Sequence, residues 1–286
     1  MRLNLIIGVL VCFAAVSFAA EVRMPDKAIA GQSIAIGTSG NGDATLYIVG
    51  PGTAIKRQVK LGEDIQLKGE ELRHAGYYQI AIKGSGSDIA KEMYVSPAAP
   101  EKINFLARPS RVPVGQPKVI AGTAFVFDQY ENLVTAPTPV SFELSVPGAA
   151  PKVERATTKN GVAYLQTGSG TKAGPGQFVV KVGDTSIRRV VEETASEPCN
   201  LRFAVHKEKD GLIAQTDPIR DCSGNAVPDG TIVTFISAEP GKGRSTVDAR
   251  VKKGIARAVL PPVPGATISV ASGVVLGNEL RWGGGE

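Results

Sequence analysis

The chain has few of the residues on which most enzymes depend. Its 286 residues include one tryptophan and two histidines, His74 and His206. A Ser–His–Asp or Cys–His arrangement would need one of these histidines, and both are interpreted here as solvated or structural residues. The sequence also lacks a G-x-S-x-G elbow, an H-E-x-x-H helix, a P-loop and a G-x-G-x-x-G turn. We therefore expect no enzyme activity, no catalytic residue and no cofactor.

Acidic residues are too sparse for a strong metal site. Asp128 with Glu131, and Asp210 or Asp221 with Asp229, offer oxygen ligands close to the ends of modules. Calcium takes six to eight oxygens, and these short sets fall well short of that number. We favour carboxylates that are hydrogen-bonded within turns, so no metal is expected. A weak calcium site at the module ends is the alternative that the sequence leaves open.

Long apolar runs are missing after the first 19 residues. The run from 5 to 18 follows Arg2 and is shorter than the roughly 20 residues that span a bilayer. Ser17 and Ala19 stand at −3 and −1 of a cut before Ala20, which is the pattern of a secretory signal peptide. We expect cleavage after residue 19 and no membrane span in the mature chain. The predicted location is periplasmic, or secreted to the cell surface of a bacterium.

Cysteine is also scarce, and removal of the signal peptide takes away Cys12. Cys199 and Cys222 remain, and two cysteines in an oxidising compartment predict one disulfide. Strands at "NLRFAV" and "LIAQTDPI", paired around a turn at 206–211, would place residue 199 opposite about residue 218. Cys222 would then lie close to Cys199, and two free thiols are the alternative.

Charge of either sign is weakly concentrated. Loss of Arg2 with the signal peptide lowers the formal net charge from +5 to +4. The densest basic stretch, 250–257, alternates with apolar residues and reads as a solvated strand face, with an anionic partner as the alternative. Because basic and aromatic residues are not interleaved, we expect no nucleic-acid partner.

Short β-type runs dominate what remains. Gly, Pro, Asn and Asp bound runs of β-branched and aromatic residues, and no long segment has a 3.6-residue period. Such evenly spaced strands indicate an all-β protein built from sandwiches. The predicted strands are 44–49, 77–82, 123–127, 139–146, 177–182, 230–236 and 266–271.

A domain-sized repeat divides the second part of the chain. Asp128 and Asn132 in "DQYENLVTAPTPVSFELS" match Asp221 and Asn225 in "DCSGNAVPDGTIVTFISA", and in both copies a strand Phe follows the Asn by ten residues. These are Phe142 and Phe235, which we assign to the core. The glycines of "NGVAYL" and "KGIARAVL" repeat at the same spacing of 93 residues. A repeat of that length indicates duplicated domains and not a solenoid.

The residues before 98 form a third module of similar size. Its "LRHAGYYQIAI" segment (72–82) has the A-G-x-Y pattern of an immunoglobulin E–F corner, with Tyr78 as the corner tyrosine. Short Pro/Ala/Glu-rich junctions at 95–102 and 191–198 separate the modules. We therefore predict a signal peptide at 1–19 and three immunoglobulin-like β-sandwich domains: module one (20–97), module two (98–193) and module three (194–286).

Residues 100–283 resemble bacterial immunoglobulin-like domains of the invasin/intimin type. The resemblance rests on the D-x-x-x-N turn, the V-x-F strand and the N/K-G-V/I-A strand start quoted above, and module one is immunoglobulin-like only in general. The resemblance implies a non-catalytic exported protein that acts in cell-envelope structure, adhesion or protein–protein assembly. Its partner would be an envelope protein or a glycan. The alternative is a carbohydrate-binding or accessory module, for which the tyrosines Tyr47, Tyr77, Tyr130 and Tyr164 are scattered in the sequence.

Overall fold

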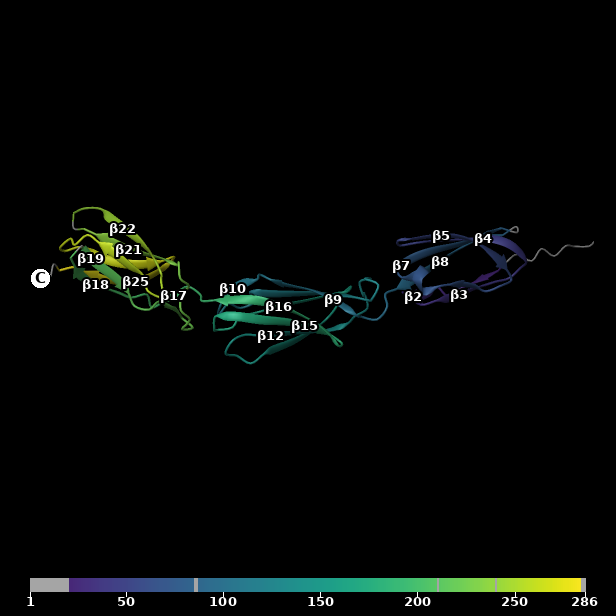
Figure 1. Ribbon diagram of the computed structural model, residues 1–286, viewed down its shortest axis with the longest axis horizontal. Coiled ribbons are helices and arrows are strands. Elements are labelled where there is room, and N and C mark those ends of the chain that lie inside the picture. Colours follow the sequence, from purple (N-terminus) through teal and green to yellow (C-terminus); the bar gives the residue numbers. More distant parts are fainter. Residues whose placement is uncertain (1–20, 85–86, 210, 240, 284–286) are drawn as a thin grey trace, which may run out of the picture. The chain divides into compact units, whose positions relative to one another are not determined.

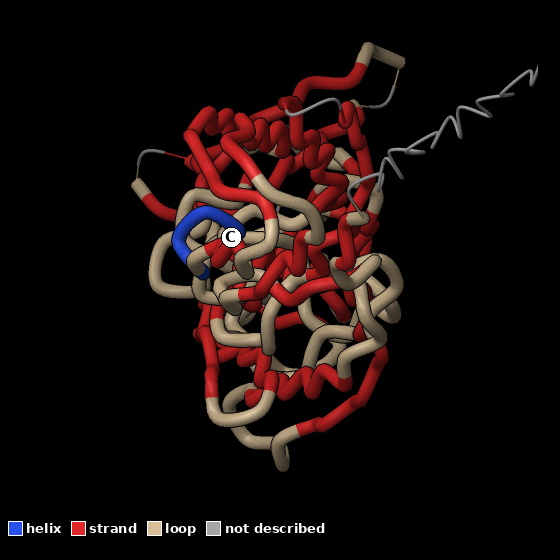
Figure 2. Tube along the Cα trace, turned by 90° about the vertical axis from the view of Figure 1, so that its right-hand side faces the viewer, coloured by secondary structure: helices blue, strands red, loops and turns tan. Residues whose placement is uncertain are grey.

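The computed structural model describes residues 21–84, 87–209, 211–239 and 241–283. The predicted signal peptide therefore lies outside the described residues, as does Asp210. The regular secondary structure of the described residues is β-strand apart from one short 3-10 helix, η1, at Gly69–Leu72, which is drawn in blue in Figure 2. Within the described ranges, no helix has the length and apolar character needed to cross a membrane.

Module one is a sandwich of two sheets with strand orders β1-β3-β6 and β2-β8-β7-β4-β5 (Figure 1). All neighbouring strands are antiparallel except β2 and β8, which run parallel. The strands are β1 Val22–Arg23, β2 Lys27–Ile29, β3 Ile34–Thr38, β4 Gly42–Gly50, β5 Thr53–Leu61, β6 Ile65–Leu67, β7 Gly76–Gly84 and β8 Ser87–Ser96.

Module two repeats this plan with the orders β14-β11-β9 and β10-β16-β15-β12-β13, and again one pair, β10 and β16, is parallel. The strands are β9 Lys102–Arg108, β10 Arg111–Pro113, β11 Ile120–Phe127, β12 Pro139–Ser145, β13 Lys152–Thr157, β14 Val162–Thr167, β15 Gly174–Val182 and β16 Thr185–Thr194.

Module three has the orders β22-β21-β24-β25 and β18-β19-β23, with β17 paired to β20. The strands are β17 Pro198–Cys199, β18 Phe203–Glu208, β19 Gly211–Thr216, β20 Arg220–Asp221, β21 Ile232–Ala238, β22 Arg244–Arg250, β23 Arg257–Leu260, β24 Thr267–Ser272 and β25 Val275–Arg281. The seven strands predicted from the sequence coincide with β4, β7, β11, β12, β15, β21 and β24, although 139–146, 230–236 and 266–271 extend one or two residues beyond the observed strands. This agreement confirms the all-β sandwich class.

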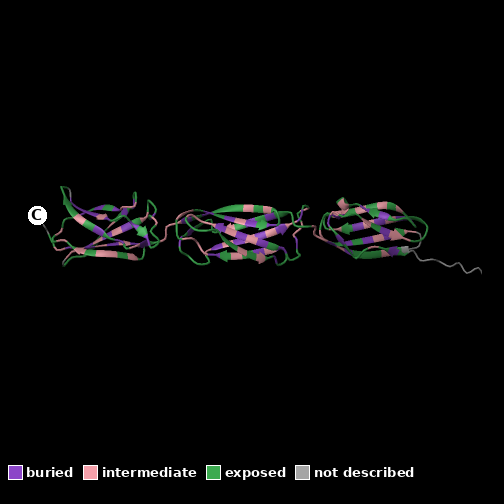
Figure 3. Ribbon diagram, turned by 90° about the horizontal axis from the view of Figure 1, so that it is seen from below, coloured by how far each residue is buried: buried purple, intermediate pink, exposed green. Residues whose placement is uncertain are grey.

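Each sandwich buries alternate residues of its strands, because successive side chains of a strand point to opposite faces. Figure 3 shows this alternation of buried and exposed residues along the strands of each module. In module two the rings of Phe105 and Phe178 meet edge to face at 5.2 Å between centroids. In module three the rings of Phe203 and Phe235 meet edge to face at 5.7 Å between centroids. Phe142 and Phe235 are both fully buried.

By its contacts the chain forms two compact units. The first holds residues up to 99 together with 127–134, and the second holds 100–126 and 135 onward. The turn with Asp128 and Asn132 thus belongs to the first unit, although it follows β11 of module two. The module boundaries at 97/98 and 193/194 stay a prediction.

The disulfide between Cys199 and Cys222 is present, with 4.9 Å between the Cα atoms. The predicted register was wrong by two residues, because Cys199 pairs with Arg220 instead of residue 218. The reason is the position of the hairpin, in which Glu208 pairs with Gly211. The strand therefore continues beyond His206, where the sequence had placed its end.

The repeated glycines end two tight hairpin turns. Asn160 and Gly161 both have positive φ, as do Lys253 and Gly254. Each turn is closed by a reciprocal pair of backbone hydrogen bonds, between Lys159 and Val162 in one and between 252 and 255 in the other. Two successive residues at positive φ define a type I′ turn, for which Asn-Gly is the preferred sequence.

This pair of turns predicts that Lys253→Asn stabilises module three. Lys253 has φ 51°, a conformation that favours Asn over lysine. The change should raise the free energy of unfolding by about 0.5–1 kcal/mol. Lys253 donates only its backbone N–H to Asp229, so this bond is kept. Calorimetry of the mature chain checks the prediction, with Lys252→Asn as the matched control. An equal gain from both variants would contradict it.

Candidate functional site at the module junctions

Asp221 is the centre of the junction between modules two and three. Its carboxylate is buried and accepts hydrogen bonds from the backbone N–H groups of Ser223 and Asn225 at 2.9 and 2.8 Å. It also accepts the side-chain amide of Asn225 at 2.9 Å. The backbone N–H of Ser196, in the linker after β16, donates to Oδ2 at 3.0 Å. The Asp221 carboxylate thus hydrogen-bonds both to its own turn and to the linker that precedes module three.

Asn225 extends this contact to the preceding module. Its Nδ2 donates to the carbonyl of Thr171 at 2.8 Å, and its Oδ1 accepts the N–H of Ala173 at 2.8 Å. Thr171 and Ala173 lie in the loop between β14 and β15. The glycine-rich loop between β14 and β15 is therefore the surface that the turn of the next module contacts.

The turn at Asp128 makes the same set of bonds within the first unit. Asp128 is fully buried and accepts the N–H groups of Tyr130 and Asn132, both at 2.9 Å, and that of Ala98 in the linker at 2.8 Å. Asn132 donates to the carbonyl of Arg73 at 2.7 Å and accepts the N–H of residue 75 at 2.8 Å. The two junctions therefore have the same pattern of hydrogen bonds.

A bulky side chain adds to the first of these contacts. Tyr130 packs against the core of module one, and a Cβ placed on Gly31 would collide with its ring. Gly31 also has φ +80°, so a larger residue would be strained there. The corresponding position of the second turn is Ser223, which has no such ring. The turn at 128–132 is thus held by packing as well as by hydrogen bonds.

The environment of both aspartates favours their charged form. Burial alone would raise the pKa of Asp128, but hydrogen bonds from Asn132, Ala98 and Tyr130 outweigh it and lower the pKa below its ordinary value. Asp221 behaves in the same way, with donors from Asn225, Ser196 and 223. Both oxygens of each carboxylate accept hydrogen bonds from N–H groups. Among the residues that the structure describes, no group of three or more His, Cys, Asp or Glu could hold a metal ion.

Sequence reasoning assigned Asp128, Asn132, Asp221 and Asn225 to turns and missed their contacts with the preceding module. A signal for these contacts was present. The dipeptide Ala-Gly at 75–76 recurs at 173–174, and the linker prolines Pro100 and Pro198 recur at the same spacing of 98 residues. The spacing of 98 residues relates the segments that the two turns contact. The spacing of 93 residues relates the two turns themselves.

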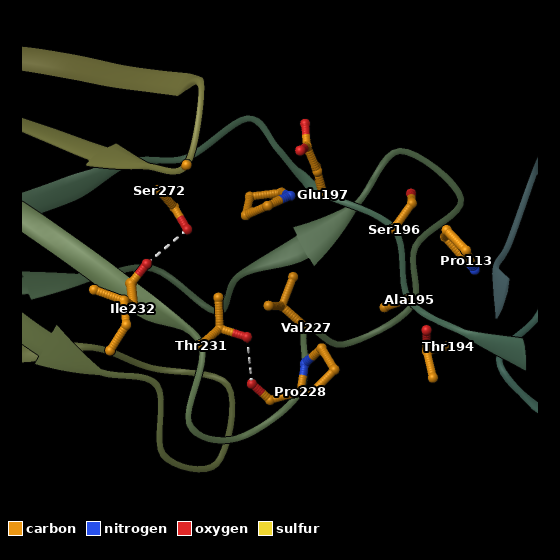
Figure 4. Close-up of a pocket in the computed structure, with 12 residues that line it drawn as sticks. Pro113, Thr194, Ala195, Ser196, Glu197, Val227, Pro228, Thr231, Ile232 and Ser272 are labelled. Carbon is orange, nitrogen blue, oxygen red and sulfur yellow. Dashed lines mark hydrogen bonds between the residues drawn. The ribbon is translucent and has the colours of Figure 1, made fainter. Parts of the chain in front are cut away.

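A hollow of about 480 Å³ lies within the second unit, along the linker that holds Ser196 (Figure 4). Pro113 and linker residues face Val227 and Pro228 across it. Thr231 donates to the carbonyl of Pro228 at 2.8 Å. The lining holds no histidine or cysteine and a single carboxylate, Glu197. Its lining offers apolar contact and hydroxyl hydrogen bonding.

Glu193 is a buried charge of module two, whereas the sequence favours solvated carboxylates for the adjacent pair Glu192 and Glu193. It is 1% exposed, Oε2 accepts the N–H of Gly170 at 2.7 Å, and Oε1 has no hydrogen-bond partner. Burial raises the pKa of Glu193, although the bond from Gly170 opposes this. Val95 occupies the corresponding position of module one and is fully buried. A carboxylate therefore stands where the fold prefers an aliphatic side chain.

We predict that Glu193→Val raises the free energy of unfolding of module two by about 1–3 kcal/mol at neutral pH. The folded state raises the pKa of this acid, so its penalty is full above the folded pKa and is relieved as the pH falls through it. The gain should therefore shrink in acid. Denaturant unfolding at two pH values measures this. Glu192→Val, at an exposed neighbour on the opposite face, should change little, and an equal gain there would contradict the prediction.

The other predicted site residues lie apart from the junctions. The hydroxyl of Tyr78 donates to the carbonyl of His74 at 2.9 Å, and its ring is fully buried. His206 is exposed and contacts Glu208 at 3.2 Å. The two histidines belong to different units, and no described side chain pairs with either as a nucleophile.

No protein-family model and no curated protein matches the chain. Among solved structures, the Escherichia coli adhesin FdeC matches with a TM-score of 0.62 at 16% identity, over 92% of this chain and 96% of the other. Yersinia pseudotuberculosis InvD matches with a TM-score of 0.52 at 11% identity, over 93% and 98%. The fold is that of bacterial immunoglobulin-like modules.

Invasin, a bacterial integrin-binding protein, shares this fold. It matches with a TM-score of 0.51 at 14% identity, over 91% of this chain and 58% of the other. Identities this low establish the arrangement of the β-sandwiches alone. The immunoglobulin-like fold agrees with the resemblance that the D-x-x-x-N turn and the strand motifs had indicated.

Proposed function

We propose that this chain is a non-catalytic exported protein whose immunoglobulin-like modules act in cell-envelope adhesion or protein–protein assembly. The observation that carries the proposal is the repeated junction turn. Asp128 and Asp221 have the burial and shifted pKa that often mark reactive groups. Their oxygens, however, are taken up by N–H donors of the turn and the linker. These two buried carboxylates thus serve the connection between modules.

The neighbours in fold support the choice of adhesion over other non-catalytic roles. FdeC is an adhesin and invasin binds integrin, and sandwich folds carry their binding sites on exposed faces and loops. Export through a signal peptide cleaved after residue 19, and module boundaries at 97/98 and 193/194, belong to the same proposal. The partner we propose is a protein of the envelope or of a surface that the cell meets.

Reconstitution with purified components tests the proposal. Candidate partners from an envelope fraction are cross-linked to the mature chain (residues 20–286), identified and purified. The expected result is a stoichiometric complex between the mature chain and one purified protein, retained after enzymatic deglycosylation of that protein. Loss of the complex on deglycosylation would contradict a protein partner. Turnover of a substrate by the mature chain would contradict the non-catalytic assignment.

A further inference from the structure

One outward face of module one holds a pair of aromatic side chains. Tyr77 on β7 and Tyr94 on β8 are direct cross-strand partners, and their rings lie 5.1 Å apart at an interplanar angle of 57°. Tyr77 is 64% exposed. Tyr78, the next residue, points into the core instead, because successive side chains of a strand alternate. The pair therefore adds nothing to the core of the module.

Three charged side chains surround the two rings. Asp26, Lys27 and Glu92 line the same hollow, of about 440 Å³, with Tyr77 and Tyr94. Lys27 is the parallel partner of Tyr94 in the neighbouring strand β2. Within the described part of the chain, none of the three charged groups forms a salt bridge or a side-chain hydrogen bond. Two acceptors, one strong donor and two phenol groups are thus open to a ligand.

This constellation occurs in module one and not at the equivalent place of module two. The pair that matches Tyr77 and Tyr94 in strand register is Pro175 and Glu192. The sandwich fold itself therefore does not require the tyrosines. Exposed aromatic side chains on a sheet, ringed by unpaired polar groups, have the character of a ligand site with an apolar face and a polar rim.

We propose that this face of module one binds a carbohydrate, with one sugar ring against Tyr77 and Tyr94. A pyranose offers an apolar C–H face to an aromatic ring and hydroxyls at its edge. Those hydroxyls can donate to Asp26 and Glu92 and accept from Lys27. The hollow is lined by two carboxylates and one ammonium, so a small cation is the competing ligand that the test includes. The inference goes beyond the proposed function, since modules can join proteins without binding a sugar.

The test is ligand-observed NMR on the mature chain with a panel of neutral oligosaccharides containing glucose, galactose, mannose or N-acetylglucosamine. We expect at least one sugar to bind. Tyr77→Ala should weaken its binding about tenfold, the loss of one stacking contact with its burial. Tyr77→Phe should keep most of the affinity, and Glu92→Gln should weaken it a few-fold. Tyr164→Ala, which removes an exposed tyrosine from module two, should have no effect.

Several results would overturn the proposal. These are absence of binding by every sugar at millimolar concentration, equal losses in Tyr77→Ala and Tyr164→Ala, or tighter binding of tetramethylammonium than of any sugar at this face. Thermal unfolding of Tyr77→Ala shows whether the variant is folded, and Glu92→Gln provides a second variant that leaves both rings in place. Formation of a complex between the mature chain and a purified protein partner does not depend on any of these outcomes.

Discussion

Replacing Asp221 with alanine is expected to lower the free energy of unfolding of module three by about 3–5 kcal/mol. The carboxylate accepts donors from Ser196, Ser223 and Asn225, and the side chain is 4% exposed. Alanine removes the shared acceptor of these part-buried N–H groups, so several hydrogen bonds to one charged group are lost together. Urea unfolding of the mature chain, with hydrogen exchange to assign the transition to module three, measures the loss.

Two further variants separate the parts played by Asp221. Asn225→Ala keeps the carboxylate but removes the bonds to Thr171 and Ala173, so it should cost about 1–2 kcal/mol. It should also speed hydrogen exchange at the N–H of Ala173. Asp128→Ala, at the equivalent turn, should reproduce the large loss outside module three. An effect of Asp221→Ala no greater than that of Asn225→Ala would contradict the central position of the carboxylate.

The pH dependence of stability gives an independent readout of the same carboxylate. Hydrogen bonds lower the pKa of Asp221 in the folded state in spite of burial. Its contribution is therefore full above the ordinary pKa of an aspartate, about 3.9, and is lost as the pH falls from there through the folded pKa. Asp221→Asn has no such titration, so the stability of module three should depend less on pH in this acid range than it does in the native chain.

The fold could be predicted because its signals are local or repeated. Strands such as "YYQIAI" alternate buried and exposed residues with a period of two, which the backbone of a strand imposes. The spacing of 93 residues identified the duplication because both copies keep the Asp and Asn of the turn. Each turn needs an Asp and, four residues later, an Asn that bonds to it. A pattern over so few residues can be recognised in the sequence.

The contacts between elements could not be derived in the same way. Asn225 hydrogen-bonds to Thr171 and Ala173, which are more than 50 residues away in the chain. The residues next to Asn225 in the sequence do not indicate these partners. Tyr77 was one of several scattered tyrosines in the sequence and Tyr94 was not singled out, because only the β7–β8 register makes them a pair. The error in the disulfide register had a similar origin. The position of the hairpin turn fixes the register of all residue pairs along its two strands, so an error in the turn shifts every pair.

Breaking the disulfide is expected to lower the free energy of unfolding of module three by about 3 kcal/mol, because it closes a loop of 23 residues in the unfolded chain. Cys199→Ala with Cys222→Ala removes the bond, and reductant should have the same effect on the native chain. Modules one and two serve as internal controls, because they contain no cysteine once residues 1–19 are removed. Unchanged stability of module three after reduction would contradict the prediction.

The disulfide and the Asp221 carboxylate connect the same two segments, because Ser196 and Cys199 precede β18 while Asp221 and Cys222 are adjacent in the chain. The bond holds the linker beside the turn, and the carboxylate then accepts the N–H of Ser196 at little further cost in chain entropy. Loss of either should therefore weaken what the other contributes. The triple variant with Asp221→Ala should lose less stability than the sum of the two separate losses, by about 0.5–3 kcal/mol. Additive losses would mean that the two act independently.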